Sequence, residues 1–329
     1  MNDTHWFLLK RVAWTAFAAY LILSGAFFVF AYTPDPNEAL VSFAAADPSD
    51  PANMSEDSKQ AVAAYEQARN YDEPVFQRYA DWMVGYATLD WGRSVTTGGP
   101  VTDALADRIP VTLAYLVPAV VVSTLLGVGV GLVSAMRPNG VVDRVSAALS
   151  YVGLGVPGFV LGELLLVASI LHFSWYRAYY DPRYGLWTAE NLVSLALPAF
   201  VVALNLLAAQ ARYARAESRE YLLAEFVKTL RASGADARTI GRHVLRNAAL
   251  PLLTVFFAEL LTVLFLTVYV VEVVFRVPGV GQLAYQAIEQ RDIGLILATT
   301  LLPAFVALLG NLFQDFAYTL LDPRVGDET

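Results

Sequence analysis

The chain has no cysteine, only three histidines and only three lysines among its 329 residues. Without cysteine it can form neither a disulfide framework nor a thiolate metal site. The histidines, His5, His172 and His243, are too far apart in sequence for the His-Glu-x-x-His pattern of a zinc hydrolase. No Gly-x-Ser-x-Gly sequence marks a hydrolase nucleophile either. We therefore expect no catalytic residue, no metal ligand and no bound cofactor in this chain.

The scarcity of lysine also excludes an ATP site of the P-loop type. Such a loop needs a Gly-Lys pair followed by Ser or Thr. Lys10, Lys59 and Lys228 follow Leu, Ser and Val, so none of them belongs to a Gly-Lys pair. Any ATP hydrolysis on which the protein depends must therefore occur on another subunit.

Charged residues are few as well. They make up 16% of the sequence, whereas hydrophobic residues make up 57% and the mean hydropathy is +0.49. This balance is too apolar for an ordinary soluble domain and indicates a membrane protein. The net charge is −8, and 19 of the 22 basic residues are arginine. An acidic, lysine-poor polar surface fits a halophile, because high salt screens the repulsion between like charges.

An uncharged run over residues 12–32 follows Lys10 and Arg11. Its 21 residues match the roughly 20 that a helix needs to cross a hydrocarbon core of about 30 Å. A secretory signal peptide also begins with basic residues, but its apolar region has about 7 to 15 residues and ends at a small-x-small cleavage site. We favour a retained first transmembrane helix.

The segment from residue 33 to 109 is polar and acidic, with 13 Asp or Glu against 5 Lys or Arg. Residues 61–87 within it carry aromatic and apolar side chains at mixed helical spacing, which predicts short interfacial helices. No catalytic constellation is recognisable there. We expect residues 1–109 to comprise the first transmembrane helix and a large acidic loop.

Further apolar segments follow, and most of them contain proline or glycine, which spanning helices tolerate. They cover residues 111–136, 145–171, 192–210, 252–274 and 295–321. The prediction is an all-α integral membrane protein with six transmembrane helices.

Basic residues gather in alternate connections between these segments. With the N-terminus inside, the inner connections hold 13 Lys or Arg in 67 residues, whereas the longer outer connections hold 9. The positive-inside rule therefore predicts that both termini are cytoplasmic and that the acidic loop is extracytoplasmic.

The longest polar interruption of the apolar part covers residues 212–251 and holds 8 of the 22 basic residues. A plain cytosolic loop would show the same charge, but apolar residues also recur here at helical spacing: Leu223, Phe226, Val227 and Leu230. We expect Gly234 to end this helix and Asp236 to cap a second one that runs to Arg246. Pro251 suits the first turn of the next spanning helix. The prediction is a helix, a glycine turn and a second helix that project into the cytoplasm.

Residues 225–251, EFVKTLRASGADARTIGRHVLRNAALP, resemble the cytoplasmic coupling segment of binding-protein-dependent ABC transporter permeases. They are most similar to the first permease subunit of the dipeptide, oligopeptide and nickel importers. Supporting stretches occur in order along the chain: DRIPVTLAYL at 107–116, GVPGFVLG at 155–162, VVEVVFRVPGVGQL at 270–283 and NLFQDFAYTLLDPRV at 311–325. Several such segments in order are far more specific than any one of them.

The resemblance implies a type I ABC importer fold, with residues 110–321 as its transmembrane core and residues 322–329 as a cytoplasmic tail. It implies a second homologous permease subunit, two cytoplasmic ATPase subunits that bind ATP and Mg²⁺, and an extracytoplasmic solute-binding protein as partners. The chain would lie in the bilayer of the cell membrane, bind no nucleic acid and catalyse no covalent chemistry. It would form half of a path for di- and oligopeptides.

The resemblance also implies which residues contact the ATPase. Lys228, Thr229 and Leu230 occupy the Glu-Ala-Ala positions of the wider superfamily, and Gly234 is the glycine of that motif. Lys228 agrees with the peptide subfamily, which has a basic residue there, whereas Leu230 and Ser233 depart from its usual Ala and Lys. The ATPase-coupling residues are expected to be Glu225, Phe226, Lys228, Thr229, Leu230, Arg231, Ala232 and Gly234.

Polar residues inside the apolar segments are candidates for the solute path or a gate. Glu163 and Glu259 would be costly against lipid, so they either line a path or are protonated or paired at a helix interface. Asn205, like Gln210, suits hydrogen bonding between helices better than solute binding. Around Glu272 the resemblance suggests a re-entrant or gating loop.

Other functions stay open at this point. Permeases of the same kind move oligosaccharides or nickel. An ion-coupled secondary transporter would use intramembrane carboxylates such as Glu163 and Glu259 and would need no ATPase. A membrane scaffold or assembly factor would need no solute path at all.

Overall fold

A computed structural model describes residues 3–45, 54–68, 70–173 and 176–321, and its regular elements are all helices. The all-α prediction is confirmed for this part of the chain, while the expected tail at residues 322–329 lies outside it. The helices are α1 (Asp3–Ala31), α2 (Pro36–Ala45), α3 (Met54–Ala68), α4 (Val75–Thr88), α5 (Val101–Met136), α6 (Val141–Gly155), α7 (Gly158–His172), α8 (Ala189–Ser194), α9 (Ala196–Leu222), α10 (Glu225–Ala232), α11 (Ala237–Thr262), the π-helical η1 (Val263–Thr267), α12 (Val268–Phe275), α13 (Val280–Glu289) and α14 (Ile293–Leu321).

Among the described residues, five helices are long and apolar enough to cross a membrane: α1, α5, α9, α11 and α14. Helices α6 and α7 together pass the same test, but they are bent by 101° at the break between them. The number of spans is therefore five, or six if the bent pair forms one. The expected six-span arrangement holds only in that second case.

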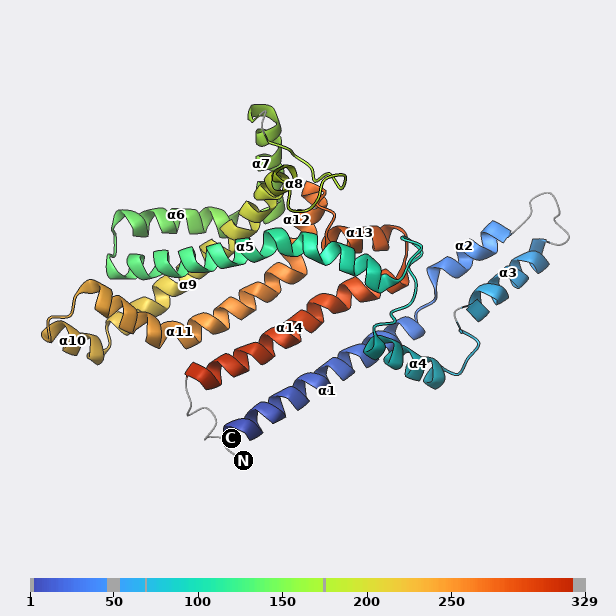
Figure 1. Cartoon of the computed structure of the whole chain (residues 1–329), viewed down its shortest axis with the longest axis horizontal. Coiled ribbons are helices and arrows are strands. Elements are labelled where there is room, and N and C mark those ends of the chain that lie inside the picture. The colour runs from blue at the N-terminus through green and yellow to red at the C-terminus, as the bar shows by residue number, and fades with distance from the viewer. Residues whose placement is uncertain (1–2, 46–53, 69, 174–175, 322–329) are drawn as a thin grey trace.

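The third apolar segment, predicted over residues 145–171, is not one continuous helix but is broken between α6 and α7. Val156 is extended (φ −97°, ψ 123°), and Pro157 (φ −54°, ψ 131°) caps the start of α7. A residue before proline avoids the helical region, and proline has no N–H to continue the ladder. The chain turns sharply at these two residues, and Figure 1 shows α7 standing away from the direction of α6.

Glycines allow α5 and α9 to pack very closely. A Cβ at Gly131 would lie 2.6 Å from both the Ala211 carbonyl oxygen and the Ala214 Cβ. A Cβ at Gly127 would lie 2.7 Å from the Gln210 Cβ. In a bilayer, close backbone packing takes the place of the hydrophobic effect between helices. These two helices therefore form a rigid pair.

The main core lies where α5, α7, α9 and α12 meet. Tyr115, Leu166, Val201 and Phe275, one from each of these helices, are buried there. A second core joins the first turns of α5 to α13 and α14, where Val101, Leu283 and Leu295 are buried together. The short helix α13 is thus packed between two long ones.

The two ends of the helix bundle are formed by different elements. Figure 1 shows α10, the start of α1 and the end of α14 toward one end, and α2, α3 and α13 toward the other. An ion pair between Arg11 and Asp315, 3.4 Å from Nε to Oδ2, joins α1 to α14. The short helices expected over residues 61–87 are present as the second half of α3 and as α4, whereas α2 had not been expected.

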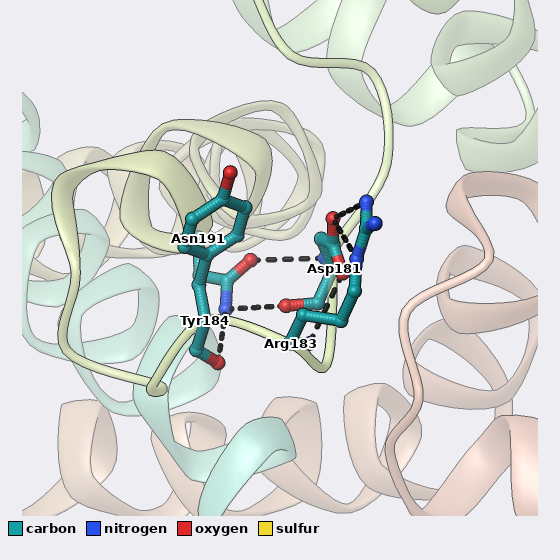
Figure 2. A network of polar contacts seen from close by, with 4 residues as sticks. All are labelled: Asp181, Arg183, Tyr184 and Asn191. Atoms are coloured by element: carbon teal, nitrogen blue, oxygen red, sulfur yellow. Dashed lines mark hydrogen bonds and ion pairs between the residues drawn. The ribbon is translucent and has the colours of Figure 1, made fainter.

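The loop before α8 is folded around a single amide side chain (Figure 2). Asn191 is 1% exposed, and its Nδ2 donates to the carbonyl oxygens of Asp181, Tyr184 and Gly185 at 3.1–3.2 Å. Its Oδ1 accepts the Asp181 N–H at 3.0 Å. Hydrogen bonds from Arg183 hold the pKa of Asp181 at about 2. This loop therefore has a defined structure although it contains no helix.

Candidate functional site

A sharp turn follows α10, as the glycine at position 234 predicts. Gly234 has φ +80°, a left-handed conformation that glycine adopts without the penalty paid by other residues. The Ala235 N–H donates to the Leu230 carbonyl at 3.0 Å, and the Gly234 N–H donates to the Arg231 carbonyl at 3.1 Å. This pair of bonds is the Schellman motif of helix ends. The prediction that Gly234 ends the helix is confirmed.

The second helix begins where expected but does not end there. Asp236 caps α11, because its Oδ1 accepts the Thr239 N–H at 2.9 Å. The same side chain's hydrogen bonding with Thr239 lowers the pKa of Asp236. The predicted end at Arg246 and the predicted new start at Pro251 are wrong, since α11 runs through both to Thr262. Spanning helices absorb a proline because neighbouring groups and local adjustments satisfy the freed carbonyl.

The inner face of α10 is anchored to the ends of the long helices. Val227 is fully buried together with Ile240 and Val244 of α11, and Phe226 and Leu230 pack on this cluster. Tyr221 of α9 and Leu132 of α5 complete it. Leu223 was predicted to belong to the same stripe, but it follows the last turn of α9 and is 75% exposed. On α10, therefore, only Phe226, Val227 and Leu230 contribute to this buried cluster.

The outer face of α10 carries most of the expected ATPase-coupling residues. Their exposed members are Glu225, Lys228, Thr229, Arg231, Ala232 and Gly234. The Lys228 ammonium and the Glu225 carboxylate lie 3.1 Å apart, but both side chains are so exposed that this ion pair adds little stability. A Cβ at Gly234 would meet no atom within 4 Å. The arrangement is a short, stiffly mounted helix with a polar outer face at one end of the bundle.

Asn205 lies in a hollow beside the α6–α7 bend. The hollow has a volume of about 250 Å³ and is lined by Pro157 and Gly158 at the bend and by Thr267 and Val271 across from it. The Nδ2 of Asn205 lies 3.6 Å from the position that a Cβ of Gly158 would take. The Asn205 side chain thus faces a space between helices. The sequence favours a hydrogen bond between helices at this position instead.

The other polar residues predicted inside the apolar segments lie in different places. Glu163 is exposed on α7, and Glu259 is half-buried on α11. Gln210 is fully buried on α9, and neither its Oε1 nor its Nε2 has a hydrogen-bond partner among the described residues. The expectation that Gln210 bonds two helices together is therefore wrong. Its side chain fills space beside Gly127 instead.

Glu272 is a buried acceptor that joins three helices. Its Oε1 accepts the Thr112 hydroxyl at 2.7 Å and the Tyr115 hydroxyl at 3.0 Å, both from α5. Its Oε2 accepts the N–H groups of Gly281 and Gln282 in the first turn of α13 at 2.6 and 3.2 Å. A carboxylate at a helix N-terminus satisfies N–H groups that have no partner within the helix. Glu272 thereby fixes α13 against α5 and α12.

The partners of Glu272 had not been predicted. Thr112 and Tyr115 are one helical turn apart, which was a visible signal, but nothing in a sequence pairs that turn with a carboxylate 160 residues later. Thr112 also accepts the Val280 N–H at 3.0 Å. Gly279 leaves room for this network, because a Cβ there would collide with the Glu272 carboxylate and the Thr112 hydroxyl.

Asp292 plays a similar part at the start of α14. Its Oδ1 accepts the Leu295 N–H at 3.2 Å, and its Oδ2 accepts the Ser94 hydroxyl at 2.7 Å and the Thr96 N–H at 2.9 Å. Burial opposes ionisation, but these hydrogen bonds outweigh it and hold the pKa of Asp292 below its ordinary value. This residue was also not predicted. It attaches the segment before α5 to the α13–α14 turn.

Comparison with known proteins identifies the family. Residues 127–327 match the family described as "Binding-protein-dependent transport system inner membrane component". The chain is 30% identical over 292 residues to the oligopeptide transport system permease protein AppB of Bacillus subtilis, covering 85% of this chain and 90% of that protein. It is 32% identical over 272 residues to the probable peptide ABC transporter permease protein y4tP of Sinorhizobium fredii, covering 82% and 86%. It is 26% identical over 321 residues to the dipeptide transport system permease protein DppB of Lactococcus lactis, covering 97% and 98%. The resemblance suggested by the coupling segment is confirmed, and the chain belongs to the family of inner-membrane components of binding-protein-dependent transport systems.

Proposed function

We propose that this chain is a permease subunit of an ATP-driven ABC importer and forms half of a membrane path for short peptides. The observation that carries the proposal is the anchored helix α10 with its polar outer face and its glycine turn. A helix that transmits force to or from another protein has to be stiff and exposed at once. The relatives' names add the chemical class of the cargo, since they are oligopeptide, dipeptide and peptide permeases.

The end that carries α10 faces the cytoplasm in this proposal. The excess of Lys and Arg in the connections at that end supports the orientation. Both termini are then inside, and α2, α3 and α4 with their acidic residues are outside. The cell membrane is the site of action.

Two ATPase subunits bind ATP and Mg²⁺ in the cytoplasm, and one of them receives α10 in a groove. Closure of the ATPase pair moves α10. Because Val227 packs on Ile240 and Val244, the movement passes directly to α11, and through Tyr221 and Leu132 it reaches α9 and α5. The chain itself contributes mechanics and no covalent chemistry.

The remaining partners complete the importer. A second, homologous permease subunit supplies the other half of the path, and an extracytoplasmic solute-binding protein delivers the cargo to the outer end. The hollow that contains Asn205 is our candidate for the path in this chain, with Glu163 and Glu259 available to face the partner permease. Glu272 acts on the gate indirectly, by holding α13.

Reconstitution of the complex in proteoliposomes tests the proposal. We expect this chain to co-purify with an ATPase and to support uptake of radiolabelled short peptides only when ATP and the solute-binding protein are present. Uptake that follows an ion gradient without ATP would favour a secondary transporter. Uptake of oligosaccharide or nickel in place of peptide would change the cargo within the same family, and absence of any uptake would favour a scaffold.

A further inference from the structure

A second hollow extends the Asn205 hollow toward the end that carries α10. It lies between α6 and α9 and has a volume of about 730 Å³. Leu154 lines both hollows, so they adjoin along the two helices. Polar groups occur at both places, with Asn205 and Thr267 in the first and Ser146 and Ser150 in the second. The two hollows thus follow one another along α6 and α9 from the α6–α7 bend toward the end of the bundle, and we call them together the groove. Between them α6 contacts α9, since the Ser150 hydroxyl donates to the Ala208 carbonyl at 3.3 Å.

The acidic residue in this groove is fully engaged. Asp143, 5% exposed, accepts two hydrogen bonds from Arg215, at 2.5 Å from Nε and 3.1 Å from Nη2. It also accepts the Asn139 N–H at 2.8 Å. The charges of Asp143 and Arg215 therefore cancel within the protein, and this pair holds the start of α6 against α9.

Two further arginines line the same hollow without such compensation. Arg144 on α6 and Arg212 on α9 are exposed. Neither guanidinium group has a hydrogen bond or an ion pair with any described residue. Two guanidinium groups thus present uncancelled positive charge at the mouth of the groove, where arginine is suited to bind a carboxylate with two parallel hydrogen bonds.

We propose that the peptide leaves along this groove beside α6 and α9. Arg144 and Arg212 bind the C-terminal carboxylate of the peptide at the cytoplasmic end of the groove. This inference rests on the proposed function, because it assumes that short peptides are the cargo. Both arginines are exposed, so their hold on the carboxylate is weak, and weak binding is what release requires.

The test compares cargo with and without the carboxylate. Complete complexes are reconstituted in phosphatidylcholine liposomes with one solute-binding protein, and ATP-driven uptake is measured for radiolabelled tri- to penta-alanine and for their C-terminal amides. The variant is Arg144→Gln with Arg212→Gln. The control is Arg242→Gln with Arg246→Gln, which removes two exposed charges from α11 outside the groove. Because the binding protein is the same throughout, its own preference cancels when each variant is compared with the wild type.

We expect the groove variant to lower the uptake ratio of acid to amide about tenfold, the effect of losing one charged hydrogen bond. Arg144→Lys with Arg212→Lys should restore only part of the ratio, because lysine keeps the charge but cannot form two parallel hydrogen bonds with a carboxylate. The α11 control should leave the ratio unchanged. A second measurement omits the binding protein: equilibrium dialysis of penta-alanine and its amide against the solubilised complex. There the wild type should retain more acid than amide, and the groove variant should retain them equally.

Several outcomes would overturn the inference. An unchanged ratio in both measurements would do so, as would an equal loss of acid and amide uptake. A loss that appears only in liposomes containing phosphatidylglycerol would indicate a lipid site instead. If wild-type complexes take up no peptide with ATP, the proposed function itself fails, and this inference fails with it.

Discussion

Thr112 and Glu272 are 160 residues apart in the chain, yet the hydroxyl of one donates to the carboxylate of the other at 2.7 Å. The contact joins α5 to α12, and the same carboxylate receives the first N–H groups of α13. A buried carboxylate is tolerable only when hydrogen bonds replace its lost hydration. Here four donors do so, and the need for them determines how three helices meet.

Replacing Glu272 with alanine should destabilise the protein strongly. The hydroxyls of Thr112 and Tyr115 and the N–H groups of Gly281 and Gln282 would lose their acceptor. Each buried donor left without a partner costs about 1–3 kcal/mol. Thermal unfolding in detergent measures the effect, and hydrogen exchange at Gly281 should speed up. Glu289→Ala, at an exposed position of α13, is the control. Equal melting temperatures for the two variants would contradict the role given to Glu272.

Two glycines two residues apart on α5 should respond in opposite ways to the same substitution. Gly131→Ala puts a methyl group against Ala211 and Ala214, and overpacking of this kind costs about 1–3 kcal/mol. Gly129→Ala meets no atom within 4 Å, and alanine favours a helix by up to about 1 kcal/mol over glycine. Unfolding of the purified variants compares them directly. The packing of α5 on α9 would need revision if Gly131→Ala were as stable as Gly129→Ala.

Substitution of Gly234 should impair coupling to the ATPase while the complex still assembles. Gly234→Leu forces a branched residue into a left-handed conformation, at a cost of about 1–2 kcal/mol, and places bulk on the outer surface of the turn. We expect the variant to insert and to assemble, while solute-stimulated ATP hydrolysis is lost. Gly234→Asn should retain much of the stimulation, because asparagine tolerates this conformation. Full solute-stimulated ATP hydrolysis in Gly234→Leu would show that the turn is not part of the contact with the ATPase.

The stability of the folded protein should depend on pH through the ionisation of Asp292. Its pKa is lower in the folded protein than in the unfolded chain, so the ionised carboxylate stabilises the fold at neutral pH. That contribution is lost as the pH falls through the ordinary range of aspartate toward the lowered pKa of the folded state. The wild type should therefore be more stable than Asp292→Asn at pH 7, and the difference should shrink on acidification. Asp81→Asn, at an exposed position, serves as the reference. A difference that stays constant down to pH 3 would show that the charge of Asp292 does not matter.

Local signals sufficed for several parts of this protein. The apolar runs indicated spanning helices, and Gly234 and Asp236 marked a helix end and a helix start, because each acts through residues no more than four positions away. The resemblance of residues 225–251 gave the family. The same local rules failed at Pro251, where the helix continues, since neighbouring helices and not the proline decide whether a span persists.

The sequence by itself determined that the chain is a helical membrane protein with an exposed glycine turn at one end. Composition and short-range patterns are enough for that, because apolar length and helix capping depend on neighbours along the chain. Only the tertiary structure decided what the buried polar residues do. Glu272 joins three helices and Gln210 fills space between two of them, since which groups meet across helices depends on packing between segments far apart in sequence. The exposed Arg144 and Arg212, 68 positions apart, likewise line one hollow only because α6 lies beside α9.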